Sequence, residues 1–167
     1  MAAGPTYEPI ATTTLSGTPL SVTFSSIPAT YTDLVLICNF STDNPVNNWI
    51  SLNGDTSANY SNTTTWGSTT SAGSTRRLND SFGILLDYYG SDTNIQSSVI
   101  VNIQDYSNTT TYKTIIARAN YATTETTETV GIWRATPAAI NSVTFKTTAT
   151  RVYAIGSTFT LYGITAA

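Results

Sequence analysis

The chain has 167 residues, the size of one domain that can bury a large core without disulfides. Charged residues make up only 10% of it and the net charge is −3, so we expect no nucleic-acid partner. Thr contributes 34 residues, and because this β-branched residue favours strands, the composition predicts an all-β fold.

The first third of the chain predicts three strands. Residues 20–25 alternate between apolar and polar side chains, as a half-buried strand does. Residues 34–40 are almost continuously apolar, which is typical of a strand buried on both faces. We expect Cys38, within that run, to be a buried and unreactive thiol. Residues 49–53 form a short strand that runs into the tight-turn dipeptide Asn53-Gly54.

Residues 57–75 are rich in Ser, Thr, Asn and Gly, and we predict a long polar loop there. Trp66 lies in its middle, and an aromatic residue in such a loop is a candidate to anchor contacts with a partner. The alternative is that Trp66 folds back onto its own domain. Arg76 and Arg77 follow as the only basic pair, and they are candidates to meet an acidic patch on a partner. The alternative for them is a solvated loop pair.

The rest of the chain predicts further strands separated by turn signals. They cover residues 82–88, 95–103, 112–121, 130–134, 140–146 and 154–164, with a loop over 123–129. A total of about eight or nine strands predicts an antiparallel β-sandwich, and the long strands and uneven connections favour a jelly roll. An immunoglobulin-like sandwich stays the alternative. We expect a short N-terminal arm, residues 1–6, and a single domain over residues 7–167.

The sequence has few of the side chains that catalysis or metal binding requires. The chain has no histidine, which excludes Ser-His-Asp and Cys-His mechanisms within it. Most of the ten acids stand beside Gly, Asn, Ser or Pro, where Asp caps turns, so we expect no catalytic carboxylate pair. We therefore expect no enzyme, no cofactor and no metal site, although calcium between loops stays open. No apolar stretch approaches 18 residues, so we expect no membrane partner either.

Aromatic side chains are the best candidates for contacts. The chain has ten Tyr and three Trp, and Tyr buries much area at low entropic cost. Tyr7 and Tyr60 stand among the tyrosines expected at strand ends or in loops, and with Trp66, Arg76 and Arg77 they complete the candidate interface. Edge packing within the sandwich, a subunit interface and stacking on glycans all stay open for these aromatics.

Several segments together are similar to a known class of proteins. They are residues 7–15 (YEPIATTTL), 24–28 (FSSIP), 30–34 (TYTDL), 52–55 (LNGD), 59–61 (NYS), 105–108 (DYSN), 112–114 (YKT), 131–134 (GIWR) and 156–164 (GSTFTLYGI). They span almost the whole chain and resemble a virion protein module of tailed bacteriophages, common in aquatic and cyanobacterial phages. The motifs are turns and strand ends, so they identify a module and no site.

The resemblance implies a non-enzymatic virion structural protein, assembled in the host cytoplasm. Such modules occur as capsid decoration (cement) proteins and within tail fibres or other tail components, usually as homotrimers. We favour a homotrimeric decoration protein that bridges major capsid subunits and stabilises the head, because a fibre normally carries a long shaft and only residues 1–6 precede this module. The alternative is a tail-associated adhesin that binds host-surface glycans and other tail proteins.

Overall fold

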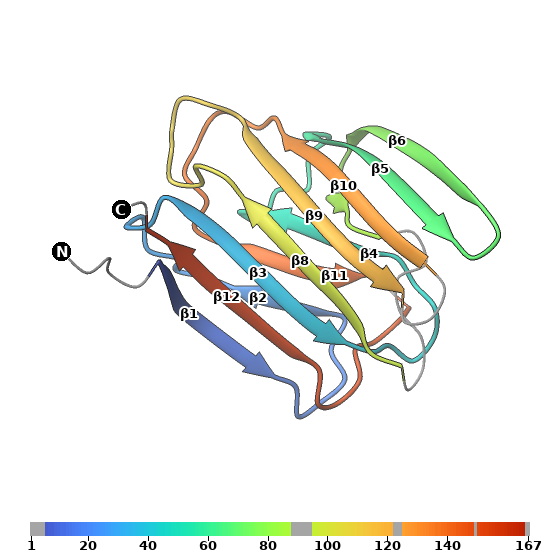
Figure 1. The fold of residues 1–167 in the computed structure, drawn as a ribbon. Helices are drawn as coiled ribbons and strands as arrows, with labels where there is room; N and C mark the ends of the chain where they lie inside the picture. The colour runs from blue at the N-terminus through green and yellow to red at the C-terminus, as the bar shows by residue number, and fades with distance from the viewer. Residues whose placement is uncertain (1–5, 88–94, 122–124, 149, 166–167) are drawn as a thin grey trace.

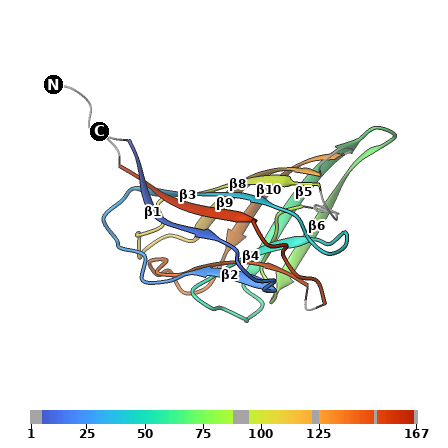
Figure 2. The same cartoon turned by 90° about the horizontal axis from the view of Figure 1, so that it is seen from below.

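Two antiparallel sheets lie face to face and form a β-sandwich (Figures 1 and 2). The computed structural model describes residues 6–87, 95–121, 125–148 and 150–165. Their strands are β1 (Tyr7–Thr14), β2 (Ser21–Phe24), β3 (Asp33–Phe40), β4 (Asn48–Leu52), β5 (Tyr60–Ser68), β6 (Ala72–Asp80), β7 (Ile84–Leu85), β8 (Ser97–Ile103), β9 (Lys113–Tyr121), β10 (Glu125–Trp133), β11 (Val143–Thr147) and β12 (Thr158–Ile164). The described residues contain no helix that is long and apolar enough to span a membrane.

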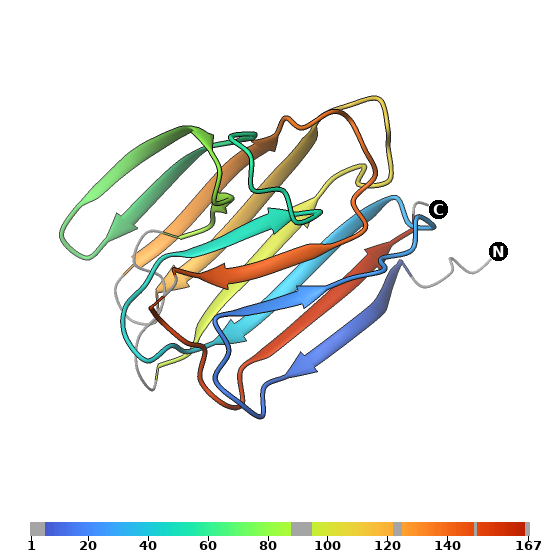
Figure 3. The same cartoon turned by 180° about the vertical axis from the view of Figure 1, so that it is seen from behind.

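The two sheets differ in width. The large sheet has the strand order β1-β12-β3-β8-β9-β10-β5-β6, and the small sheet has the order β2-β11-β4-β7. The chain passes repeatedly from one sheet to the other, in a jelly-roll-like manner. Figure 3 shows the small sheet in front of the large one, with the green β5–β6 hairpin extending past it. Strands β1 and β6 are the two edges of the large sheet.

A cluster of four aromatic rings joins the two sheets. Phe40 and Phe159 come from the large sheet, Phe145 comes from the small sheet, and Tyr153 lies in the connection between β11 and β12. Every ring contacts the other three, with centroid distances from 5.2 to 6.1 Å. Each such pair contributes about 0.5–1.5 kcal/mol beyond the area that it buries. The cluster therefore holds the sheets together at one end of the core.

The predicted all-β sandwich is confirmed, and so is the burial of Cys38. The number of strands is wrong, because the described residues form 12 and we expected eight or nine. The predicted loop over 57–75 is in fact most of the β5–β6 hairpin, and the predicted loop over 123–129 contains the start of β10. Thr-rich segments alternate between buried and exposed side chains just as apolar strands do, so their polarity misled the prediction.

One glycine in the large sheet is covered by an aromatic ring. Gly163 in β12 lies under Tyr31, and a Cβ atom at Gly163 would stand 2.3 Å from the Tyr31 ring. The backbone N–H of the next residue, Thr32, donates to the carbonyl of Ile164 at 2.7 Å, which fixes the ring in this position. The close approach therefore needs a residue without a side chain at 163.

Substitution Gly163→Ala should lower the free energy of unfolding by about 1–3 kcal/mol, the usual range for an overpacked site. Urea unfolding measures this directly. Gly17→Ala is the matched control, because a Cβ atom there meets nothing within 4 Å. Equal stability of the two variants would contradict the packing described.

Candidate functional site

The large sheet has a face that the small sheet does not cover, called the outer face below (Figure 2). Successive side chains of a strand point to opposite sides of a sheet. In β10 the side chains of Thr127 and Thr129 are buried toward the small sheet, whereas Glu128 and Val130 point outward and are exposed. The register carries this pattern onto β9 and β5, where Ile116 and Thr63 flank Val130.

Apolar side chains form a stripe across the middle of the outer face. The stripe consists of Tyr162, Val35, Ile116 and Val130, with Ile37 and Ile100 in the neighbouring row. Asn102 interrupts the first row between β3 and β9. Val130 is 52% exposed and Ile100 is 44% exposed. Outward positions of a sheet with one wet face are normally polar, so this apolar stripe is a departure that a partner surface would explain.

Uncharged polar groups surround the apolar stripe. Thr12 donates to the hydroxyl of Thr160 at 3.1 Å, and Ser98 donates to the side chain of Asn39. These hydroxyl and amide groups can exchange hydrogen bonds with a partner or with bridging water. The outer face can therefore form broad, polar contacts around an apolar middle.

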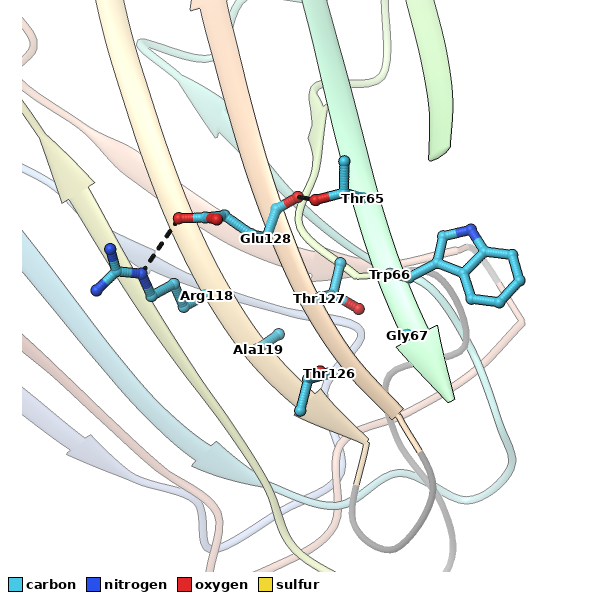
Figure 4. A pocket seen from close by; sticks show the side chains of 8 residues that line it. All are labelled: Thr65, Trp66, Gly67, Arg118, Ala119, Thr126, Thr127 and Glu128. Atoms are coloured by element: carbon cyan, nitrogen blue, oxygen red, sulfur yellow. Dashed lines mark hydrogen bonds and ion pairs between the residues drawn. The ribbon is translucent and has the colours of Figure 1, made fainter. Parts of the chain in front are cut away.

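The charges in the middle of the outer face cancel. The Arg118 Nε atom lies 3.3 Å from Glu128 Oε1, and both side chains are more than half exposed. An exposed pair of this kind contributes little to stability, at about 0–1 kcal/mol. Figure 4 shows the pair on the side of β10 away from Trp66. The pair lines an open hollow of about 490 Å³ over β9, β10 and β5.

Two more hollows lie on the outer face. One, of about 370 Å³, is lined by Arg76, Leu78 and Val130 among others. The other, of about 270 Å³, has Tyr7 and Asn102 in its lining. Tyr7 is 57% exposed, and its ring lies 6.1 Å from the Tyr162 ring. Two predicted interface residues, Tyr7 and Arg76, thus belong to the outer face.

Trp66 packs against its own hairpin. It stands opposite Gly73 in the register of β5 and β6, and a Cβ atom at Gly73 would lie 2.8 Å from the indole. The indole points away from Arg118 and Glu128 (Figure 4). The alternative interpretation, that Trp66 folds back onto its domain, is therefore the one that fits this geometry.

The two arginines do not act as a pair, because neighbouring residues of a strand face opposite ways. Arg76 is exposed beside the outer face. The Arg77 guanidinium instead lies 4.7 Å from the centroid of the Trp49 ring, and its Nη1 atom lies 3.5 Å from Asp80 Oδ2. Because Arg76 and Arg77 are adjacent residues of the same type, the sequence does not reveal that they face opposite sides of the sheet.

Tyr60 is wrong as an interface residue, because its side chain is fully buried. Its hydroxyl accepts a hydrogen bond from the Leu52 N–H at 3.1 Å, and the carbonyls of Leu52 and Asp55 lie within 3.2 Å as acceptors. Burial, opposed by the bond from Leu52 and assisted by the Asp55 charge, raises the pKa of Tyr60 to about 12. The ring fills the core while the hydroxyl ties β5 to the turn after β4.

The apolar stripe was missed although the sequence carries its signal. Residues 34–40 are apolar at both even and odd positions, which predicts that both faces of that strand are buried. The small sheet buries the inner face of β3, and Val35 and Ile37 point to its outer face. Among the described residues no three Cys, Asp or Glu side chains gather as a metal site would require.

No protein-family model and no curated protein matches this sequence. Among solved structures, a double mutant of the alginate lyase Aly36B bound to an alginate trisaccharide is 12% identical, with a TM-score of 0.26, and the match covers 75% of this chain and 71% of that one. A second Aly36B mutant, bound to an alginate tetrasaccharide, is 13% identical with a TM-score of 0.21, over 74% and 69% of the two chains. A likeness of this size carries no argument about this chain.

Substitution Tyr60→Phe should change how stability depends on pH. The pKa of Tyr60 is raised in the folded state from 10.0 to about 12. The neutral hydroxyl of Tyr60 therefore contributes fully to the free energy of unfolding below pH 10, and this contribution is lost as the pH rises toward 12. The variant should therefore lose less free energy of unfolding than the wild type over this range. At pH 7 it should be about 1–3 kcal/mol less stable, because the buried Leu52 N–H loses its acceptor.

Chemical unfolding from pH 8 to pH 12 measures both effects. Tyr112→Phe is the control, since Tyr112 is 54% exposed and its loss should leave stability unchanged. Identical stability of Tyr60→Phe and the wild type at pH 7 would show that the buried hydroxyl has no such role.

Proposed function

We propose that this chain is a non-enzymatic virion structural protein of a tailed phage. The specific role that we propose is that of a homotrimeric capsid decoration protein, which binds the major capsid protein through the outer face. The observation that supports this is the apolar stripe, in which Val130 and Ile100 are exposed on a broad, almost neutral sheet face. The resemblance of the sequence motifs to phage virion modules supplies the identity of the partner.

The outer face has the area that a stable contact needs. Its eight strands are about 4.8 Å apart, which gives a width of about 34 Å. The strands have seven to nine residues at about 3.3 Å each, so the face measures roughly 800–1,000 Å². A standard protein interface buries about 800 Å² per partner. A flat contact with a shell would therefore need no other surface of the chain.

The chemistry of the outer face also suits a protein partner. Interfaces have an apolar centre with a polar rim and bridging water, which is the order found here from Val130 outward to the Thr, Ser and Asn side chains. Three symmetric copies would add their contacts, so each one need not be strong. Closed three-fold symmetry also matches the local three-fold positions of an icosahedral shell.

A tail-associated adhesin is the second candidate. Tyr7 lines the hollow of about 270 Å³ together with Asp33, Asn102 and Gln104, and its ring contacts the ring of Tyr162. An exposed aromatic ring beside carboxylate and amide groups is suited to stack on a sugar and bond its hydroxyls. This candidate places the protein at the tail and keeps it non-enzymatic.

The number of copies per particle separates these two locations. Quantitative mass spectrometry of virions that carry this protein, with the major capsid protein as the internal standard, should find hundreds of copies. A shell with many three-fold positions requires that number. A count of roughly a dozen or fewer would place the chain at the tail and contradict the decoration role.

Substitution Ile100→Glu should weaken binding to heads that lack the protein by at least about tenfold, which corresponds to about 1.4 kcal/mol. The reason is that a carboxylate would be buried against the partner in the apolar stripe. Leu20→Glu is the matched control, because Leu20 is 43% exposed against 44% for Ile100 and lies outside the outer face. Equal losses in the two variants, measured by co-sedimentation with heads, would remove the outer face as the docking surface.

A further inference from the structure

The side of the small sheet that is turned away from the large sheet carries a cluster of aromatic and charged residues (Figure 3). Lys146 of β11 and Trp49 of β4 are register partners, next to the partners Phe145 and Ile50. Phe145 and Ile50 are fully buried between the sheets, so alternation places Lys146 and Trp49 on the opposite side. Trp49 is nevertheless only 5% exposed, because other residues cover it.

The connection between β6 and β7 covers Trp49. Phe82 in this connection meets the Trp49 ring edge to face, with 5.3 Å between the ring centroids. The next residue, Gly83, lies directly against β4, since a Cβ atom there would stand 2.4 Å from the carbonyl oxygen of Ile50. The φ angle of Gly83 is +144°, which a residue with a side chain rarely adopts. The backbone therefore fixes the position of Phe82.

Two cations lie on the faces of these two rings. The Arg77 guanidinium carbon lies 4.7 Å from the Trp49 ring centroid, and Lys146 Nζ lies 4.2 Å from the Phe82 ring centroid. Arg77 reaches Trp49 because it points to the same side of the large sheet as its buried register partner, Asn62. Cation–π contacts of this kind hold a positive charge in place and leave it unneutralised.

The carboxylate of Asp80 interacts with both cations. Its Oδ2 atom lies 3.5 Å from Arg77 Nη1. Burial lowers the pKa of Lys146, and the negative charge of Asp80 opposes this effect. Asp80 Oδ1 accepts the backbone N–H of Phe82 at 2.8 Å, which holds the carboxylate in place. Two cations and one carboxylate leave the cluster with a net charge of +1, and the ion pair shows that a carboxylate fits against the Arg77 guanidinium.

Two N–H groups of the cluster lack an acceptor. The buried side-chain polar atoms without a hydrogen-bond partner, among the described residues, include Trp49 Nε1 and Arg77 Nε. The indole of Trp133, by contrast, donates to Asp55 Oδ2 at 2.7 Å. Native proteins rarely leave buried N–H groups unpaired, and the dipoles of these two add to the positive potential of the cluster. Both features favour the binding of an anion.

Hydroxyl groups lie on the same side of the small sheet, next to Lys146. Ser21 is the register partner of Lys146 on β2 and is exposed. The hydroxyl oxygens of Thr23 and Thr144, two positions farther along, lie 2.9 Å apart. The four strands of the small sheet contain no Asp or Glu, so no acid within them competes for Lys146. A ligand with hydroxyl groups beside its acidic group suits this arrangement.

We infer that Arg77 and Lys146 form a binding site for the carboxylate group of a ligand. The carboxylate would neutralise the positive charge that Asp80 leaves over, and the planar guanidinium offers it parallel N–H donors. The side chain of Arg77 is 37% exposed, so a ligand can reach it from solvent. The site lies away from the outer face, and the inference does not depend on the proposed function.

An NMR titration of the full chain with acetate and with D-glucuronate tests the inference, with sodium chloride keeping the ionic strength constant. The reporter is the indole N–H signal of Trp49, which the variant Trp49→Phe assigns. This signal should shift saturably with both acids, whereas the indole signal of Trp133, already bonded to Asp55, should stay unchanged. Uncharged D-glucose should move neither signal. Tighter binding of D-glucuronate than of acetate would show that the ligand hydroxyls add to the recognition of the carboxylate.

Removing either cation should weaken binding. Arg77→Gln and Lys146→Gln should each raise the dissociation constant at least about tenfold, because the ligand loses a charge-assisted hydrogen bond. Arg151→Gln is the matched control, since its side chain is 39% exposed against 37% for Arg77 and it also has a carboxylate partner, Asp43 at 3.8 Å. This variant should bind as the wild type does.

Removing the internal carboxylate should have the opposite effect. Asp80→Asn should lower the dissociation constant at least about threefold, because it removes a competing negative charge. The amide oxygen can still accept the backbone N–H of Phe82. A variant that fails to fold cannot produce this gain in affinity.

Three results would overturn the inference. One is a Trp49 signal that responds to neither acid, or that moves only when the Trp133 signal moves equally. Another is an equal loss of affinity in Arg77→Gln and Arg151→Gln, which would indicate a general charge effect. The third is weaker binding by Asp80→Asn. The copy number in virions tests the proposed function separately.

Discussion

The unequal width of the two sheets is the constraint on which the rest of the structure depends. Eight strands face four, so one side of the large sheet is covered and the outer face is open. Inside, the four aromatic rings around Phe40 hold the sheets together. Outside, Ile100, Ile116 and Val130 remain where a solvated sheet would carry polar residues. The open apolar stripe thus follows from the same alternation that builds the core.

The charged residues beside the apolar stripe balance each other. The middle of the outer face has a balanced pair, Arg118 and Glu128. In the proposed function the outer face meets the shell.

The fold class could be predicted because alternation and Thr content both favour strands, and the core strands were located to within a few residues. The β5–β6 hairpin could not, since a polar strand and a polar loop have the same composition. The candidate site was harder still. Parity within a strand decides that Arg76 is exposed while Arg77 stacks on Trp49, and only three-dimensional packing shows that Tyr60 is buried. Single-residue exposure depends on partners that are distant in the chain.

The orientation of the domain on the particle tests the central claim most directly. A cryo-EM reconstruction of the head, at a resolution that separates the strands, should show the large sheet lying against the shell with Val130 at the contact, and the small sheet facing outward. A domain that is bound through the small sheet, with the apolar stripe left in solvent, would contradict the account.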